Sequence, residues 1–362
     1  MIIIAFISMF VIAVLGLVYL VTRFHCFEYI RKIAQERRAL SWLIASMPVC
    51  VIAVFFFLET VSTTVFVLHL MVFWLLCDLA NMIIRKIRKK DFRRYYAGAA
   101  AILVTVVYLS AGWYYGHHVY QTEYTVKAEK DIGEKGLRVV QISDSHVGST
   151  FDGEGFAEYM QKVSETDPDV VVITGDFVDD DTLKKDMIAS CRALGKIKST
   201  YGVYFVFGNH DKGYFNRRDF TEEELRDELK ENKVTILEDE SVLIDNRFYI
   251  FGRQDRSVGE RTGTDDLTKG LDTSKYIIVL DHQPHDFDEQ VTAGADLVLC
   301  GHTHGGQMFP VGITGVLSGE YDRAYGIEKR KDTTFIVSSG ISDWAIPFKT
   351  AAISEYVVID IR

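Results

Sequence analysis

The first third of the chain is dominated by long apolar runs. Residues 1–22 contain no charged side chain, and three further apolar runs follow at about residues 41–58, 65–84 and 97–113. A helix of roughly 20 apolar residues is long enough to cross a bilayer. A cleavable signal peptide is disfavoured for the first run because no basic residue precedes it. We therefore predict a transmembrane region of four helices at residues 1–120.

Basic residues separate these apolar runs. Five Lys/Arg lie in residues 23–40 and seven lie in residues 85–94, whereas the turn at residues 59–64 has none. The positive-inside rule places the two basic loops in the cytoplasm. With four spans, everything after Tyr115 then lies outside. This pattern predicts a multi-pass protein of the cell membrane with residues 121–362 on the extracytoplasmic side.

Two ionisable residues lie within the third apolar run. His69 and Asp78 are nine residues apart, so on a helix they point to opposite sides. Asp78 is close enough in sequence to Arg85 and Lys86 for its carboxylate to reach them. We expect structural roles for His69 and Asp78. A transport or sensor role for the spans would have only these two residues as support.

Beyond residue 120 the pattern changes to short apolar runs that alternate with helical patterns. The runs are rich in β-branched residues, which indicates strands buried on both faces, as in α/β proteins. The strand candidates are residues 137–142, 170–174, 203–207, 234–237, 242–244, 248–251, 276–280, 296–300, 335–337 and 355–361. The helix candidates are residues 154–165, 182–198, 221–230 and 286–292. The loops at residues 252–274 and 305–333 are long, which is typical of functional loops.

The charge is distributed unevenly between these two parts. Residues 1–120 hold 12 Lys/Arg and 5 Asp/Glu, and the rest of the chain holds 28 and 45, so the net charge of −10 combines +7 with −17. The acidic second part argues against nucleic acid as a partner, because duplex binding needs Lys/Arg contacts to phosphates. With 48% hydrophobic residues and only five cysteines, the chain is neither disordered nor a small disulfide scaffold.

Polar clusters follow five of the predicted strands. They are Asp144-Ser145-His146, Gly175-Asp176 with Asp179, Gly208-Asn209-His210-Asp211, Asp281-His282 and Gly301-His302-Thr303-His304. Ligands of α/β sheets gather at the carboxyl ends of strands. Each cluster alone is ordinary loop chemistry. Five clusters in order, with five of the six histidines after residue 120, favour one shared metal site.

The donor types restrict which metals the site takes. Carboxylate, imidazole and amide oxygen donors suit Mn²⁺, Zn²⁺ or Fe²⁺. The candidate ligands are Asp144, His146, Asp176, Asn209, His282, His302 and His304. Seven ligands exceed what one tetrahedral zinc takes, but they fit two ions if one carboxylate bridges them. Two divalent ions would make the site positive within an acidic domain, which favours an anionic substrate such as a phosphate.

The five clusters, in this order, resemble the calcineurin-like metallophosphoesterase family, whose pattern is D-x-H, G-D-x-x-D, G-N-H-D/E, H and G-H-x-H. The stretch Gly301–Gln307 further resembles the membrane-anchored, exported branch, which includes phosphodiesterases and lipid-precursor pyrophosphatases. Members of this branch usually have one anchor or an export signal, so four spans depart from its pattern. The resemblance implies a catalytic domain at residues 121–362 with a two-sheet β-sandwich flanked by helices, a four-layer αββα arrangement.

The resemblance also implies how the ligands divide between two metals. One metal would be held by Asp144, His146 and His304. The second would be held by Asn209, His282 and His302, and Asp176 would bridge the two ions.

Catalytic roles follow from the same resemblance. A hydroxide bridging the two metals would attack phosphorus in line, and His210 would protonate the leaving oxygen or stabilise charge on the phosphoryl group. Asp211 would orient His210, and Asp179 would hold a metal ligand in place. Where the branch commonly has Pro-x-Arg, this chain has Pro347-Phe348-Lys349. Lys349 is therefore a possible substrate contact.

Together these features predict a membrane-tethered phosphoesterase with two divalent ions per chain. The substrate would be a phosphoester or pyrophosphate that is membrane-proximal or lipid-linked. This substrate class is motivated by the short tether after Tyr115 and by the apolar loop residues Met308, Phe309, Ile346 and Phe348. The alternative is a non-catalytic membrane scaffold or sensor that retains the fold, against which the intact ligand set weighs.

Overall fold

The computed structural model describes residues 2–89, 94–215, 217–259 and 261–362. Within them the chain divides into two compact units, residues 1–111 and residues 112–362, called here the N-terminal and the C-terminal unit. Part of the predicted basic loop, residues 90–93, lies outside the described residues. Each unit is described by itself.

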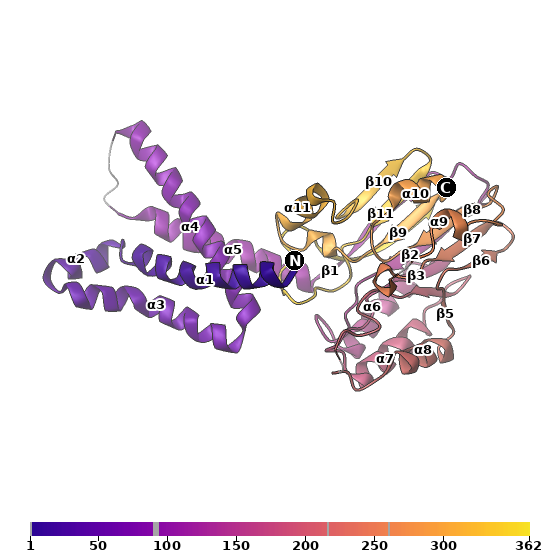
Figure 1. Ribbon diagram of the computed structural model, residues 1–362, viewed down its shortest axis with the longest axis horizontal. Coiled ribbons are helices and arrows are strands. Elements are labelled where there is room, and N and C mark those ends of the chain that lie inside the picture. Colours follow the sequence, from indigo (N-terminus) through magenta and orange to yellow (C-terminus); the bar gives the residue numbers. More distant parts are fainter. Residues whose placement is uncertain (1, 90–93, 216, 260) are drawn as a thin grey trace. The chain divides into compact units, whose positions relative to one another are not determined.

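The N-terminal unit consists of apolar helices. These are α1 (Ile2–Phe24), α2 (Glu28–Glu36), α3 (Arg38–Leu58), α4 (Thr60–Arg88) and most of α5 (Tyr96–His117) (Figure 1). Helices α3, α4 and α5 are each long and apolar enough to cross a membrane. Helices α1 and α2 form a pair bent by 76° that provides a fourth candidate span. The described residues therefore give three or four candidate spans. The predicted loop at 23–40 is wrong in part, because it contains the amphipathic helix α2.

Polar groups inside this unit are paired. We expected the carboxylate of Asp78 to reach Arg85 and Lys86. In the structure, Asp78 Oδ2 accepts from Arg23 Nη1 at 3.0 Å, and Asp78 Oδ1 accepts from the Tyr95 hydroxyl at 2.6 Å. His69 Nδ1 donates to the carbonyl of Val65 at 2.8 Å. These contacts support the structural roles that we expected for both ionisable residues.

The C-terminal unit contains two mixed sheets of six strands each. The strands of the first sheet, in spatial order, are β1 (Val119–Val126), β12 (Ser354–Ile361), β2 (Leu137–Ile142), β3 (Val170–Thr174), β4 (Val203–Val206) and β5 (Val234–Ile236). Those of the second are β10 (Gly326–Arg330), β11 (Thr333–Val337), β9 (Leu297–Cys300), β8 (Tyr276–Leu280), β7 (Phe248–Gly252) and β6 (Glu240–Ile244). Strands β2 to β5 run parallel, and β12 is antiparallel to β2.

The central strands are apolar at every position because both of their faces are covered. In β3, Val170 and Val172 belong to an apolar cluster that combines side chains of both sheets. The alternate residues Val171 and Ile173 belong to a second cluster, which includes the inner faces of three helices. Successive side chains of a strand point to opposite faces, so one run of β-branched residues serves both clusters.

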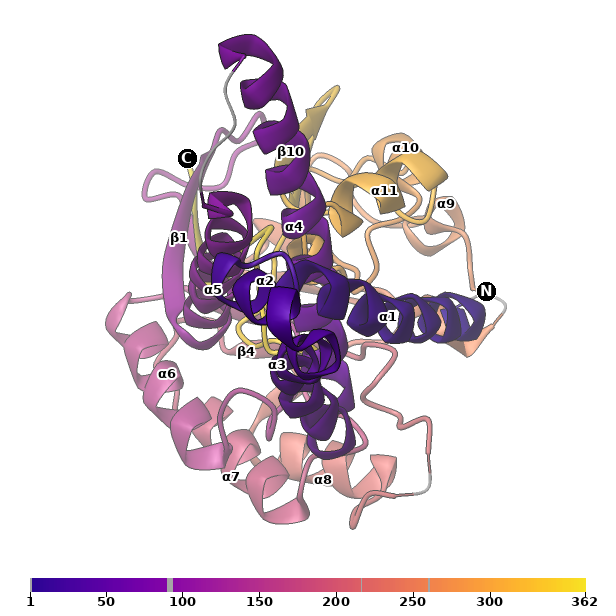
Figure 2. The same ribbon diagram turned by 90° about the vertical axis from the view of Figure 1, so that its left-hand side faces the viewer.

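Helices cover the outer faces of the two sheets. The helices are α6 (Gly153–Glu165), α7 (Lys184–Leu194), α8 (Glu222–Glu231), α9 (Thr264–Leu267), α10 (Phe287–Thr292) and α11 (Val311–Ser318). Figure 2 shows α6, α7 and α8 together on one side of this unit and α10 and α11 on the other. Phe287 of α10 stacks on Phe335 of β11 with ring centroids 3.9 Å apart. Thr221 and Glu224 form the predicted capping box at the start of α8.

The α/β fold with two mixed sheets agrees with the sequence-based prediction, and all ten predicted strands are present. Two strands were not predicted. Residues 119–126, which we took for part of a tether, form β1 and pair in parallel with β12. The other is β10. Both lie at sheet edges with half-exposed, partly polar residues, so neither has the continuous apolar run of a central strand.

Candidate metal centre

The five polar clusters come together at the carboxyl ends of β2, β3, β4, β8 and β9. Close approach between these strand ends requires glycine at two motif positions. A Cβ atom on Gly208 would collide with the carboxylate and backbone of Asp176. A Cβ on Gly301 would collide with Ser143 and with the carboxylate of Asp144. The glycines of the G-N-H-D and G-H-x-H motifs therefore let neighbouring loops pack against the buried acids.

The first group of candidate ligands consists of Asp144, His146 and His304. One ligand atom from each lies within 4.8 Å of the others, and all three side chains are buried. The Nε2 atom of His304 is 3.6 Å from Asp144 Oδ1. Asp144 also accepts the backbone N–H of His302 at 3.0 Å and the hydroxyl of Ser143 at 2.5 Å. These bonds fix the carboxylate without using all of its lone pairs.

The second group consists of Asp176, His282 and His302, again within 4.8 Å of one another. His282 Nε2 lies 3.1 Å from both Asp176 Oδ2 and Asn209 Oδ1. The other ring nitrogen of His282, Nδ1, donates to the carbonyl of Thr174 at 2.8 Å. That bond leaves Nε2 as the ring nitrogen free to act as a ligand. Asp176 also faces the first group, because its Oδ2 atom is 3.8 Å from His146 Nε2.

Several of these residues have strained backbones. Positive φ angles are found at Asp144 (51°), His146 (37°), Asp176 (52°), His302 (70°) and His304 (48°). Left-handed conformations are uncommon for residues with a side chain and cost on the order of 1–3 kcal/mol each. Their concentration at one rim indicates that the surrounding fold holds these side chains in place for a function.

The protonation states of two histidines fit cation binding, whereas for His146 and His282 burial is outweighed by the neighbouring aspartates, which raise the pKa of both rings. Burial lowers the pKa of His302 to about 4 and the pKa of His304 well below its usual range. Both rings are therefore neutral near pH 7, as a metal ligand must be. Burial opposes ionisation of Asp176, but the neighbouring His282 outweighs it and lowers the pKa of that carboxyl well below its usual range.

Unpaired ring nitrogens provide a further test of whether metal ions fit. His146 Nε2, His302 Nδ1 and His304 Nδ1 are buried without a hydrogen-bond partner. Buried polar atoms are nearly always paired, so three unpaired imidazole nitrogens beside two buried aspartates are suitable donors to a cation. The residues present therefore fit a pair of divalent ions. The assignment of individual ligands to each ion, including Asn209 and a bridging Asp176, stays a prediction.

Asp179 and Asp211 lie around this centre and hold it in place. Asp179 Oδ2 is 3.1 Å from His146 Nδ1, which orients the imidazole toward the first group. We expected Asp211 to orient His210. The structure gives its carboxylate another task, since it accepts four backbone N–H groups, from Gly208 (2.7 Å), Asp176 (2.9 Å), Phe177 (2.8 Å) and Val178 (3.0 Å). Asp211 therefore ties the loop after β3 to the loop after β4.

His210 lies beside the first ligand group and keeps its ring partly exposed. Its backbone N–H donates to Asp176 Oδ1 at 2.8 Å. The imidazole packs between Trp344, at 4.6 Å between ring centroids, and Tyr214, at 5.0 Å. The Tyr214 hydroxyl accepts from Asn209 Nδ2 at 2.9 Å. Sequence reasoning missed Tyr214 and Trp344, because neither belongs to a ligand motif.

Lys349 is placed differently from our expectation. Its side chain is fully buried, and its Nζ atom donates to the carbonyls of Ser339 at 2.7 Å and Gly340 at 3.1 Å. Burial lowers the pKa of Lys349 to about 8. The segment that it ties down, around Gly340, packs directly against the side chain of Asp144. This geometry favours support of the metal centre over direct contact with substrate.

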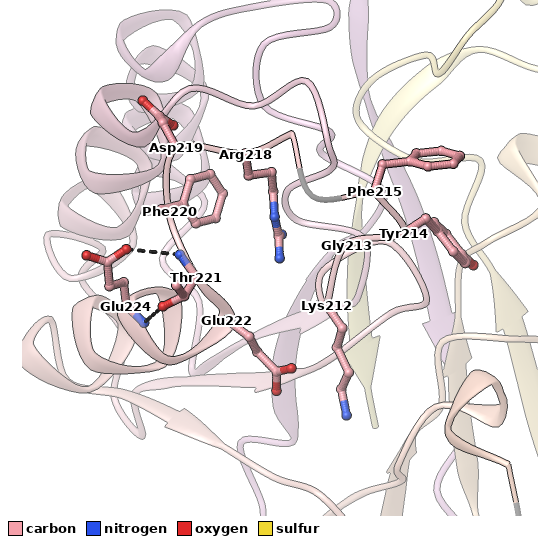
Figure 3. A pocket seen from close by; sticks show the side chains of 10 residues that line it. All are labelled: Lys212, Gly213, Tyr214, Phe215, Arg218, Asp219, Phe220, Thr221, Glu222 and Glu224. Carbon is pink, nitrogen blue, oxygen red and sulfur yellow. Dashed lines mark hydrogen bonds between the residues drawn. The ribbon is translucent and has the colours of Figure 1, made fainter.

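Cavities open on two sides of the centre. One of about 330 Å³ is lined by Asp179, Trp344 and Gly148, among others. A larger one of about 660 Å³ lies next to the His210 loop and is lined by residues from Lys212 to Glu224. The guanidinium of Arg218 points into this second cavity (Figure 3), and its Nη1 atom donates to the backbone carbonyl of Asp211.

Fold and site together define an α/β protein with a buried candidate dinuclear metal centre. A family profile described as calcineurin-like phosphoesterase matches residues 137–306, a stretch that contains all five motif clusters. An uncharacterized metallophosphoesterase of Aquifex aeolicus is 32% identical over 249 residues, which cover 66% of this chain and 90% of that protein. The chain therefore belongs to the calcineurin-like metallophosphoesterase family, whose members bind two divalent metals.

Other relatives are similar over part of their length. A Danio rerio protein named transmembrane protein with metallophosphoesterase domain is 32% identical over 63% of this chain and 53% of its own length. The chain spans 59–60% of several further bacterial relatives. Among solved structures, a dimetal phosphatase from Danio rerio aligns with 56% of this chain and 87% of its own, with a TM-score of 0.38 and 10% identity.

Proposed function

We propose that this protein is a membrane-tethered, two-metal phosphoesterase. The observation that carries the proposal is the pair of candidate ligand groups beside a half-buried histidine, His210, that belongs to neither group. The residues that would hold the ions are Asp144, His146, Asp176, Asn209, His282, His302 and His304. When bound, two divalent ions, Mn²⁺, Zn²⁺ or Fe²⁺, supply a water of lowered pKa and positive charge for the phosphoryl group.

His210 would act on the leaving group. Its ring is held in one orientation by Trp344 and Tyr214, and it lies 5.1 Å from the ring of His146, between centroids. A ring N–H of His210 can therefore donate to an oxygen of a phosphate bound at the first ligand group. Proton donation by a positioned imidazole is worth about 10²–10⁴ in rate.

The substrate class follows from what surrounds the centre. Gly305, which directly follows the ligand His304, also lines an apolar cavity of about 630 Å³ with Phe309, Ile313 and Val316. Burial of apolar chain against such a surface is favourable by about 25 cal/mol per Å². We therefore assign to this site a phosphoester or pyrophosphate attached to a lipid. The apolar lining favours a substrate with a lipid chain, and it fits a monoester, a diester and a pyrophosphate equally well.

An activity panel tests the chemistry. Full-length protein reconstituted with Mn²⁺, Zn²⁺ or Fe²⁺ is assayed on phosphomonoesters, phosphodiesters and lipid pyrophosphates in detergent. We expect metal-dependent release of phosphate or phosphomonoester, reduced strongly in His210→Ala and unchanged in the matched control His118→Ala, which lies outside the motifs. Equal turnover by wild type and His210→Ala would contradict the proposal.

A second comparison tests the lipid. Val316→Asp places a charge in the apolar cavity without touching a ligand. We expect kcat/KM to fall for a lipid-linked substrate and to stay constant for a soluble one with the same phosphoryl group. If both substrates respond alike, the apolar cavity is not a lipid site.

We also propose that the C-terminal unit lies outside the cytoplasm of the cell membrane. The support is the clustering of basic residues at 23–40 and 85–94, which the positive-inside rule places in the cytoplasm. The C-terminal unit follows the last candidate span and would then lie on the opposite side. A Val258→Cys variant in the loop at 252–274 tests this, in a chain whose Cys26, Cys50 and Cys77 are replaced by Ala. Labelling by a membrane-impermeant thiol reagent in intact cells is expected. Labelling only after lysis would place the site in the cytoplasm.

A further inference from the structure

Helix α11 exposes an apolar surface that a protein domain normally buries. Its eight residues, Val311–Ser318, include no charged side chain. Leu317 is 81% exposed, Ile313 and Val311 are each 55% exposed, and the preceding Phe309 is 60% exposed. Contiguous exposed apolar patches of this kind mark interaction sites. Phe309, Ile313 and Leu317 also line the apolar cavity that is assigned above to the lipid chain of the substrate.

The start of this segment is connected to the end of the last candidate span through Lys349 and Thr350. The backbone N–H of Phe309 donates to Thr350 Oγ1 at 3.1 Å, and the N–H of Thr350 donates to the carbonyl of Gln307 at 2.8 Å. The neighbouring N–H of Lys349 donates to the carbonyl of Gly112 in α5 at 2.9 Å. The residues that lead into α11 are thus fixed to the last turns of α5.

The last turns of α5 mark the level of the membrane surface. Trp113, Tyr114 and Tyr115 follow Gly112 directly, and they are 51%, 49% and 41% exposed. Exposed Trp and Tyr at the end of an apolar helix are typical of the lipid headgroup region. Figure 1 shows α11 at the same end of the C-terminal unit as β1, the strand that follows α5. Lys349 is bonded to Gly112 and Thr350 to the residues before α11, so the start of α11 is held close to these aromatic residues.

We propose that α11 is an interfacial helix that enters the bilayer surface and anchors the rim of the metal centre there. The partner is lipid, because the exposed face is uncharged and the segment is tied to a membrane-spanning helix at the depth of its aromatic residues. Such helices lie in the membrane plane with the apolar face about 5–10 Å into the headgroup and acyl boundary. This inference does not depend on the proposed activity.

Fluorescence quenching in lipid nanodiscs tests the proposal. Leu317→Cys, in the full chain with Cys26, Cys50 and Cys77 replaced by Ala, is labelled with a polarity-sensitive nitrobenzoxadiazole dye. The matched control is Leu243→Cys on β6, which is 41% exposed at the opposite edge of the second sheet from β10. We expect a blue shift and loss of fluorescence with spin-labelled lipids at position 317, and neither at position 243.

Ile313→Cys is labelled in the same way as a second probe, and it replaces the 317 variant if that variant does not fold. Three outcomes decide the proposal. Quenching by lipids labelled at a shallow acyl carbon, at each α11 position that can be measured, supports it. Emission typical of water at 313 and 317 would overturn it. A blue shift without quenching by lipid would also overturn it, because another protein surface, either a helix of the N-terminal unit or a second copy, would then cover α11.

Discussion

Two sets of polar groups, one in each unit, differ in how they are paired. In the N-terminal unit, both carboxylate oxygens of Asp78 are paired, with Arg23 and Tyr95. In the C-terminal unit, ring nitrogens of His146, His302 and His304 are buried with no partner. A paired group contributes to folding, whereas an orphaned group costs about 1–3 kcal/mol unless something else binds it. The contrast distinguishes Asp78 from the three candidate ligands, although other buried atoms of the C-terminal unit, such as Gln141 Oε1 and the Tyr276 hydroxyl, also have no hydrogen-bond partner among the described residues.

The two units also differ in how far their apolar side chains are exposed. Phe57 and Leu58 at the end of α3 are 91% and 73% exposed, whereas Ile277 and Ile278 of β8 are fully buried. Contact of Phe57 and Leu58 with lipid is favourable, whereas their contact with water is unfavourable, so their exposure agrees with a membrane environment. Helix α11 is one part of the C-terminal unit whose apolar exposure resembles that of the spans, and Phe215, which is 61% exposed, is another.

Removing the charge of Asp176, a candidate ligand, is expected to have the largest effect on activity. Asp176 lies within reach of ligands of both groups, so Asp176→Asn should reduce kcat/KM by about 1,000-fold or more, since metal-ion stabilisation is worth several kcal/mol. The matched control is Asp78→Asn in the N-terminal unit, which should lower thermal stability and leave kcat/KM close to wild type. A large loss of activity in both variants would contradict the distinction between the structural acid Asp78 and the candidate ligand Asp176.

Replacing His210 is expected to have the next largest effect. His210→Ala should lower kcat by about 10²–10⁴, the range for general acid–base catalysis, while the metal content stays at the wild-type value. Metal analysis alongside steady-state kinetics separates these two quantities. Loss of metal in this variant would mean that His210 is a ligand.

Asp179 is expected to act through His146 and so to have a smaller effect. Asp179→Asn leaves the side-chain shape but weakens the bond to His146 Nδ1, and outer-shell partners of metal ligands are worth about 10–100-fold in metal affinity or activity. We expect a weaker apparent metal affinity with kcat largely recovered at saturating metal. A kcat that does not recover would assign Asp179 to the chemical step.

The last expected effect is on stability and not on activity, and it is the pH dependence that comes from Lys349. Its pKa is lowered from 10.5 to about 8 in the folded protein, so between these values the unfolded chain binds more protons. Stability should therefore rise with pH across this window, by up to about 3 kcal/mol, and the penalty is fully present below pH 8. Lys349→Met should lack this rise. Thermal unfolding measured across the window in both proteins checks the difference.

Much of the fold and site could be predicted because the candidate ligands come directly after strands that are recognisable in the sequence. Central strands are continuous apolar runs, and residue types that bind metals directly follow β2, β3, β4, β8 and β9. The sequence therefore indicated which residues would meet at one rim. The edge strands β1 and β10 escaped prediction because their residues alternate or are mostly polar, and only pairing with β12 and β11 makes them strands.

The roles of single residues were harder to predict because they depend on loops that meet only in the folded chain. Asp211 binds backbone N–H groups of two loops, a geometry that no motif spacing encodes. Trp344 reaches the ring of His210 from a segment more than a hundred residues away. Helix α11 contains Gly312 and Gly315 and no charges, so it shows neither helix propensity nor an amphipathic pattern.

The central claim is that the two ligand groups hold a pair of divalent ions, and metal counting tests it most directly. Purified full-length protein, equilibrated with Mn²⁺ or Zn²⁺ and freed of excess metal, is analysed for metal per chain in wild type and in His304→Ala, which removes a ligand of the first group only. The account predicts two ions per wild-type chain and one per chain in the variant. Fewer than two ions in wild type, or the same count in both proteins, would contradict it.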